Sequence, residues 1–246
     1  MTQHIPHPAH PEMLESLLAS TPARLGVWRA GCRPMTAQWL KFRADHATAR
    51  DAVHSELSAA FEEFAKDRGF PVIQTMAAGR HDFVLFPPKG KRTDDETLAR
   101  LKSVCPSNQD VQIVISDGLS ASAVEANIPD LLPMLEQALT SAGITYGLPV
   151  VVRFGRVAIA DQIGHALNAK LALNLIGERP GLSSSLSLSA YLTFNPGPNT
   201  ISSDRTVVSN IHSRGTPAVE AGAYAASLCK KILDLKVSGV RLQQMG

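Results

Sequence analysis

The residues best placed for chemistry stand in turns that follow apolar runs of this 246-residue chain. The run 111–116 ends at a turn that contains Gly118, and the run 171–176 ends at a turn in which Glu178 lies between glycines. A carboxylate accepts hydrogen bonds from amide N–H groups, and neighbouring glycines let the backbone approach a bulky ligand closely. Taken alone, this turn supports a ligand contact by Glu178 about as well as an ion pair with Arg179.

Short β-branched runs bounded by turns are typical of strands buried in a parallel sheet. The sequence predicts strands at 111–116, 149–154, 171–176 and 186–194, and helices at 129–142, 160–168 and 218–235. Strands separated by crossover helices indicate an α/β fold, Rossmann-like, with a largely parallel sheet flanked by helices. Because ligands bind beyond the carboxyl ends of such strands, we expect a pocket at that edge of the sheet.

The front of the chain predicts a helix that begins near Pro34 and Thr36. Apolar residues share one helical stripe, namely Trp39, Phe42, Ala49, Val53, Leu57 and Ala60. His46 lies in the same stripe, and we interpret it as a packed or hydrogen-bonded residue rather than as a metal ligand. The charged opposite face fits a solvated surface or a contact with a partner. We divide the chain into a helical, partner-contacting region at 1–70 and an α/β domain at 71–246.

A less regular stretch follows the front helix. The residues 81–86 predict a short apolar strand that a Pro-Pro pair ends, and the residues 93–102 predict a helix with acidic residues at its front.

Composition excludes several classes of function. The net charge is only +2, which predicts neither a nucleic-acid partner nor an anionic membrane partner. The first residues lack the features of an export signal, and no run is long enough to cross a bilayer, so we expect a cytosolic protein. The three cysteines are widely spaced and odd in number, which favours reduced structural thiols over a disulfide framework or a metal site.

The common cofactor and nucleophile motifs are absent. The sequence has no G-x-G-x-x-G after a strand, no phosphate-binding G-x-x-x-x-G-K-[ST] and no G-x-S-x-G elbow. Ordinary nicotinamide, ATP and hydrolase functions therefore lose their main support. The segment 161–165 also lacks the Asp-x-His-x-x-Gly arrangement by which some cobalamin proteins ligate cobalt.

Several short segments of this sequence occur together, and in the same order, in one protein family. They are Trp28-Arg29-Ala30-Gly31, Phe42-Arg43-Ala44-Asp45-His46, Val114-Ile115-Ser116-Asp117-Gly118-Leu119-Ser120, Arg153-Phe154-Gly155-Arg156-Val157, Ile176-Gly177-Glu178-Arg179-Pro180-Gly181-Leu182 and Ser209-Asn210-Ile211-His212. The chain thus resembles the small (light) subunit of ethanolamine ammonia-lyase, an adenosylcobalamin-dependent enzyme. The match covers most of the chain.

The resemblance implies a role in radical deamination of ethanolamine to acetaldehyde and ammonia. It implies that Val157, Glu178 and Val207 contact adenosylcobalamin, which this chain encloses together with a large barrel subunit. Val207 stands where some family members have cysteine, so only a backbone contact would be kept there. We assign no catalytic residue and no metal ligand to this chain, and we expect no activity without the large subunit.

Two other functions remain open from the residues. One is a free-standing Rossmann-like enzyme that binds a nucleotide cofactor through an unrecognised loop, and the other is a purely structural assembly subunit. The resemblance also leaves open whether the cytosolic complex is enclosed in a bacterial microcompartment.

Overall fold

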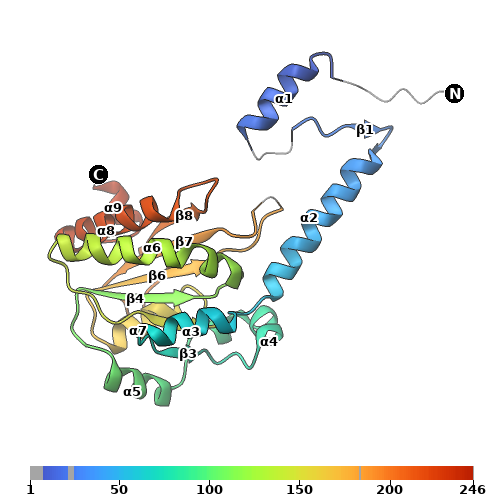
Figure 1. Ribbon diagram of the computed structural model, residues 1–246. Coiled ribbons are helices and arrows are strands. Elements are labelled where there is room, and N and C mark those ends of the chain that lie inside the picture. The colour runs from blue at the N-terminus through green and yellow to red at the C-terminus, as the bar shows by residue number, and fades with distance from the viewer. Residues whose placement is uncertain (1–7, 22–24, 183, 246) are drawn as a thin grey trace.

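The computed structural model describes residues 8–21, 25–182 and 184–245, and the larger sheet of this part has six strands (Figure 1). The strand order is β3-β5-β4-β6-β7-β8, with bounds Val72–Gln74, Val150–Arg153, Val111–Ser116, Leu171–Gly177, Leu188–Phe194 and Arg205–Ile211. The strands β3, β5, β4 and β6 run parallel, whereas β7 and β8 are antiparallel to their neighbours. The predicted α/β fold with a largely parallel sheet is therefore confirmed.

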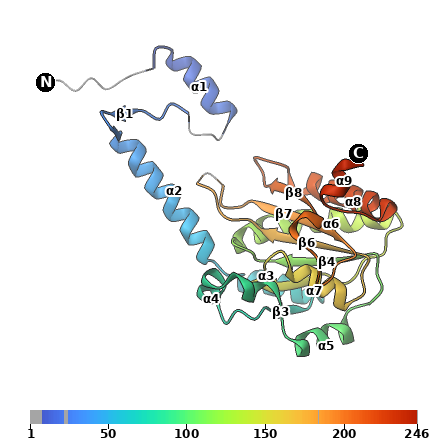
Figure 2. The ribbon, with the colours of Figure 1, turned by 180° about the vertical axis from the view of Figure 1, so that it is seen from behind.

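Helices cover both faces of this sheet, as Figures 1 and 2 show from opposite sides. The helices α3 (Ala59–Asp67), α6 (Ala121–Ser141), α8 (Ala218–Leu235) and α9 (Val240–Gln244) share one apolar core, and α5 (Asp95–Val104) and α7 (Ile159–Ala166) share another. Every residue of β4 and β6 is buried. A central parallel strand carries helices on both faces, which explains the uninterrupted apolar runs in the sequence.

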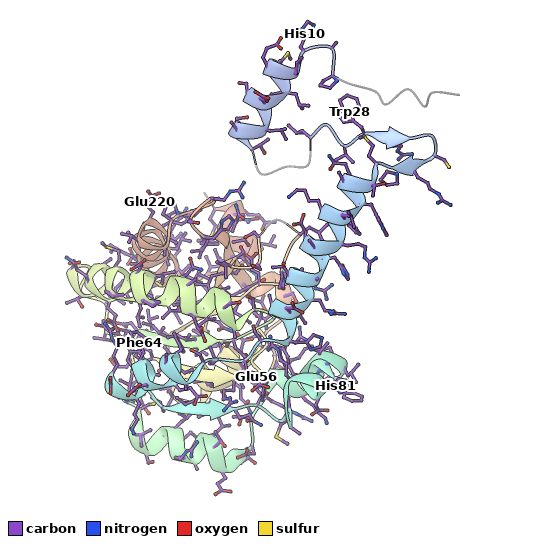
Figure 3. The ribbon with its side chains drawn as sticks, turned by 45° about the vertical axis from the view of Figure 1, so that its right-hand side comes forward. His10, Trp28, Glu56, Phe64, His81 and Glu220 are labelled. Atoms are coloured by element: carbon purple, nitrogen blue, oxygen red, sulfur yellow. The ribbon has the colours of Figure 1, made fainter. Side chains whose placement is uncertain are left out.

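The N-terminal elements form an arm that leaves the rest of the molecule. We call α1 (Pro11–Ser20), β1 (Arg29–Ala30), β2 (Arg33–Pro34) and α2 (Thr36–His54) the arm, and the elements from α3 onward the body. Figures 1 and 2 show α2 extending away from the body, with α1 beyond its far end. In Figure 3, His10 and Trp28 lie at this far end, and Glu56 lies where the arm joins the body.

The apolar stripe predicted on the first long helix does not enter the core. Ala52 is the one buried residue of α2, all of whose residues are described, and Trp39 is 48% exposed. The rings of Trp39, Phe42 and His46 instead stack along the helix surface, with neighbouring centroids 5.6 and 6.3 Å apart. The helix also ends at His54, so Leu57 lies beyond it and packs in the core of the body.

The prediction of a strand at 81–86 is wrong, because this segment forms the helix α4 (Arg80–Leu85). The place beside β5 at the edge of the sheet is taken by β3. Asp82 accepts the N–H of Ala78 at 2.9 Å, which stabilises the first turn of the helix. Phe83 is fully buried against Phe154, and the 3₁₀ turn η1 (Pro87–Lys91) follows.

The predicted start of the helix at 129 is also wrong, because α6 begins at Ala121 and contains Pro129 and Pro133. Ser120 caps the helix by accepting the N–H of Ala123 at 3.1 Å. The strands β3 and β8, and the turn η2 (Ser202–Asp204) before β8, were not predicted. The closing helix at 218–235 is confirmed as α8.

Candidate functional site

The carboxyl ends of β4, β5 and β6 meet at one edge of the sheet, because these strands are parallel. The turns that follow them line a concave cavity of about 390 Å³. Its walls come from the turns at 118–119, 156–157 and 176–179, together with Ser189, Tyr191 and Ser209 of the outer strands. The structure thus places a cavity at the edge where the sequence predicted a pocket.

Two glycines allow the turns after β4 and β6 to pack backbone against backbone. A Cβ on Gly118, whose φ is +57°, would lie 2.1 Å from the carbonyl oxygen of Gly177. A Cβ on Gly177 would lie 2.1 Å from the carbonyl oxygen of Ser120. Leu119 N–H donates to the same Gly177 oxygen at 3.0 Å. The backbone that leads into Glu178 is therefore fixed by contacts that only glycine permits.

Glu178 is held at the cavity wall by its own neighbours. Its Oε1 atom accepts the hydroxyl of Ser189 at 2.5 Å and the backbone N–H of Asn210 at 3.0 Å. Among the described residues it forms no ion pair with Arg179, although the sequence left that alternative open. Because Oε1 takes both hydrogen bonds, the carboxylate is oriented and Oε2 is left for a further donor.

Val157 lines the same cavity from the turn between β5 and α7. Its carbonyl oxygen accepts the side-chain amide of Asn174 at 3.2 Å, and Asn174 Oδ1 accepts the hydroxyl of Ser116 at 2.9 Å. These two hydrogen bonds connect β4, β6 and the Val157 backbone, and they fix the position of Val157 above the sheet. The structure therefore brings Val157 and Glu178 to one cavity.

Val207 lies beside this cavity rather than in its lining. It pairs in register with Tyr191, which does line the cavity, and its side chain is 43% exposed. The residues Leu188, Ala190 and Leu192 of β7 enter the core, so the alternation of the strand turns Ser189 and Tyr191 to the opposite face. Burial, and then the charge of Glu178, raises the pKa of Tyr191.

Arginines surround the inner rim of the cavity. Arg156 Nη2 donates to the carbonyl oxygen of Phe83 at 3.2 Å, and its guanidinium lies 4.2 Å from the centre of that ring. Burial, followed by the charges of Arg80 and Arg179, lowers the pKa of Arg156. The site can therefore offer a carboxylate, cationic groups and apolar surface to one bulky ligand.

A buried ion pair at this edge was missed in the sequence. Arg80 Nη1 lies 3.3 Å from Asp117 Oδ2, and the two side chains are 5% and 1% exposed. Burial raises the pKa of Asp117 to about 6, against the opposing effect of Arg80. Asp117 was visible as an acid in the turn after a strand, but no sequence signal places Arg80 opposite it.

No group of three or more His, Cys, Asp or Glu residues in the described part of the chain could hold a metal ion. No helix in the same residues is both long and apolar enough to cross a membrane.

Together, the fold and the site define an α/β protein with a cavity at the carboxyl edge of its sheet and an arm that buries little of its own surface. The family model of the ethanolamine ammonia-lyase light chain (EutC) matches residues 11–243. The chain therefore belongs to this family, and it is a component of an ammonia-lyase complex.

Two curated relatives give the extent of the similarity. The ethanolamine ammonia-lyase small subunit of Clostridium perfringens is 44% identical over 239 residues, which are 97% of this chain and 80% of the relative. That of Fusobacterium nucleatum subsp. nucleatum is 45% identical over 223 residues, which are 91% of this chain and 75% of the relative. Both alignments include the cavity and most of the arm.

Proposed function

We propose that this chain forms one wall of an adenosylcobalamin site in ethanolamine ammonia-lyase and that the large subunit forms the rest. The observation that carries the proposal is the shared cavity of Val157 and Glu178, in which the carboxylate is oriented with one oxygen left for a donor. Bound adenosylcobalamin supplies the radical that takes hydrogen from ethanolamine. The residues of this chain hold the cofactor and exclude water from it.

The chemistry of the cavity fits such a cofactor. A corrin carries amide groups around its edge, and Glu178 Oε2 is placed to accept an amide N–H. Leu119, Val157 and Ile176 offer apolar surface to the ring. A cavity of about 390 Å³ is much smaller than a cobalamin, so most of the cofactor must be covered by another surface. We assign that surface to the large barrel subunit.

We also propose that the arm docks on the large subunit. Trp39 and Leu40 of α2 are 48% and 59% exposed, and Leu17 and Leu18 of α1 are each 44% exposed. Isolated helices gain little stability without a packed face, so a helix with this composition needs a partner. The relatives are named as small subunits, and that name supplies the partner. We place the complex in the cytoplasm, free or within a bacterial microcompartment.

Replacement of Glu178 tests the cofactor contact. Glu178→Gln keeps the size of the side chain but removes the charge that strengthens its hydrogen bonds to amide groups. Loss of one such bond typically costs about 1.5–3 kcal/mol, so cobalamin affinity of the assembled complex should fall by roughly tenfold or more. Equilibrium dialysis with adenosylcobalamin measures this affinity.

The matched control is Glu220→Gln, which removes an exposed carboxylate from the first turn of α8 (Figure 3). This variant should bind cobalamin as the unmodified complex does. If Glu178→Gln instead lowered the melting temperature and left cobalamin affinity unchanged, Glu178 would be a structural residue and the proposed site would be wrong.

Reconstitution tests the shared site. The purified chain should neither deaminate ethanolamine nor bind adenosylcobalamin tightly, because one wall leaves the corrin in water. Both properties should appear when the large subunit is added. Turnover by this chain alone would contradict the proposal and favour a free-standing enzyme. Full activity and cobalamin binding by the large subunit alone would favour a purely structural role.

A further inference from the structure

One buried guanidinium connects the arm to the rim of the cavity. Arg80 is the first residue of α4, and its side chain is 5% exposed. Its Nε atom donates to the carbonyl oxygen of Val53 at 2.6 Å. Its Nη1 atom donates to the carbonyl oxygen of Gly118 at 2.8 Å and to Asp117 Oδ2 at 3.3 Å. A single side chain thus bonds the last turn of α2 and the turn after β4.

The contact with α2 has a clear physical basis. Val53 lies in the last turn of α2, where carbonyl groups have no partner within the helix. The carboxyl end of a helix also carries a partial negative charge, which a guanidinium stabilises. Ser55 Oγ donates to the neighbouring Ala52 carbonyl at 2.8 Å, so the end of the helix is held from two sides. Arg80 therefore anchors the root of the arm.

On its other side, the Arg80 guanidinium bonds Asp117, which holds the turn that carries Val157. Asp117 Oδ1 accepts the backbone N–H of Gly155 at 2.9 Å. The preceding residue, Phe154, has a φ of 58°, a left-handed conformation that is costly for a bulky side chain. Thr75 Oγ1 donates to the carbonyl oxygen of Phe154 at 2.9 Å and supports the same turn. Asp117 therefore holds the strained turn that directs Arg156 and Val157 into the cavity.

We propose that Arg80 and Asp117 are positioning residues that link docking of the large subunit on α2 to the affinity of the cavity for adenosylcobalamin. This inference rests on the proposed function of the cavity. Neither residue is among those that line the cavity. Arg80 fixes the arm relative to Asp117, and Asp117 fixes the rim on which Val157 stands. Binding at either end is therefore favoured by the geometry that binding at the other end requires.

Arginine is needed because the acceptors point in different directions. The planar guanidinium presents separate donors to Val53 on one side and to Asp117 and Gly118 on the other. A lysine ammonium is a single centre at the end of a flexible chain and cannot reach both elements in this geometry. Arg80→Lys thus keeps the charge beside Asp117 and loses the link, whereas Arg80→Met loses both.

The first test measures the reconstituted complex. For Arg80→Met we expect the KM for adenosylcobalamin to rise by about tenfold or more, with kcat at saturation within about twofold, since the variant disturbs cofactor positioning rather than the reaction. The dissociation constant between the two subunits should rise as well. Arg80→Lys, which keeps the charge beside Asp117, should give values of both constants between those of the unmodified chain and those of Arg80→Met. The control is His81→Ala, which truncates an exposed side chain on the same helix and should change neither constant.

A second measurement follows the arm directly and needs no cofactor. Cys32 is exposed in the turn between β1 and β2, whereas Cys105 and Cys229 are buried, so a thiol-reactive dye reports on the arm. Anisotropy decay of this dye should show a larger amplitude of arm motion in Arg80→Met than in the unmodified chain. Asp117→Asn keeps an acceptor for Gly155 N–H and serves as the milder variant if Arg80→Met does not fold.

The outcomes separate the two proposals. If the unmodified complex bound no cobalamin, the proposed function would fail, and the dye on Cys32 would still decide whether Arg80 anchors the arm. If the folded Arg80 and Asp117 variants kept the unmodified KM, subunit affinity and anisotropy, the link would be disproved. A rise in KM with unchanged subunit affinity and anisotropy would also contradict it, because Arg80 would then act on the cavity alone.

Discussion

The helices α2 and α6 are of similar length, 19 and 21 residues, but they are stabilised in different ways. Nine residues of α6 are buried against the sheet and α8, whereas α2 buries Ala52 alone. Most helical stability in proteins comes from packing of an apolar face rather than from intrinsic propensity. We therefore expect the body to be stable as a folded unit and the arm to depend on a surface outside this chain.

The largest expected effect comes from a cavity in the body. Leu132 of α6 is fully buried, so Leu132→Ala should lower the free energy of unfolding by about 2–5 kcal/mol. Leu40 of α2 is 59% exposed, and Leu40→Ala should change it by less than about 0.5 kcal/mol. Urea denaturation of the full chain measures both. Equal losses in the two variants would mean that arm and body unfold as one unit.

The next effect concerns pH and the junction between arm and body. The pKa of Asp117 rises from 3.8 to about 6 through burial, with Arg80 and Arg156 as the facing cations and Glu56 acting on Arg80. The folded state then binds this proton more tightly than the unfolded state. The contribution of Asp117 to stability is therefore complete below pH 3.8 and is lost as the pH rises to about 6.

Asp117→Asn removes this titration. The difference in unfolding free energy between the unmodified chain and the variant should change by roughly 3 kcal/mol between pH 3.5 and 7, at about 1.4 kcal/mol for each pKa unit. The unmodified chain should lose stability relative to the variant as the pH rises. Denaturation curves across this range measure the difference, and a constant difference would show that the pKa of Asp117 is not raised.

The third effect should appear only in the complex. Trp39→Ala should leave the unfolding free energy of the chain nearly unchanged but weaken association with the large subunit by about 2 kcal/mol or more, roughly thirtyfold. Tyr224→Ala on α8 is the control, because Tyr224 is an aromatic residue of similar exposure on the body. Titration calorimetry measures the association. A larger loss from the Tyr224 variant would place the docking surface on the body.

The smallest expected effect comes from two Lys–Asp pairs of the same spacing, one in the arm and one in the body. Lys41 pairs with Asp45 on α2, and Lys230 pairs with Asp234 on α8, each four residues apart; both lysines are exposed, whereas the Asp45 side chain is 25% and the Asp234 side chain 61% exposed. Lys230→Met should lower the unfolding free energy of the chain by about 0.3–0.5 kcal/mol. Lys41→Met should have no effect, since the arm contributes little to global unfolding. A loss in the Lys41 variant as large as that in the Lys230 variant would show that α2 unfolds with the body.

The sequence predicted the centre of the sheet well and its edges poorly. The runs 111–116 and 171–176 match β4 and β6 closely, because strands buried on both faces are apolar throughout and end at glycine turns. The strand β8 was missed because it is an edge strand in which Ile211 alone is buried, while Val207, Ser209 and Asn210 are exposed. Its pairing with β7 is not encoded in its own apolar pattern.

The same limit holds for the site. Glu178 was recognisable because a carboxylate between glycines follows a strand. Arg80 was not, since its partners Val53, Asp117 and Gly118 are brought to it by the fold and not by spacing. The predicted stripe on α2 was correct as a helix pattern, but a pattern cannot say whether its partner belongs to the same chain.

The strand order also sets a sequence of events during synthesis. The strand β3 emerges from the ribosome first among the six strands, yet its partner in the sheet is β5, where Val72 pairs with Val151. The strand β4 and the whole of α6 must be synthesised before that partner exists. Closure of such a long loop makes parallel pairing slow. The turn at Phe154 and Gly155, which follows β5 and is held by Asp117, therefore forms only after this loop has closed, although Arg80 and Asp117 are made before it.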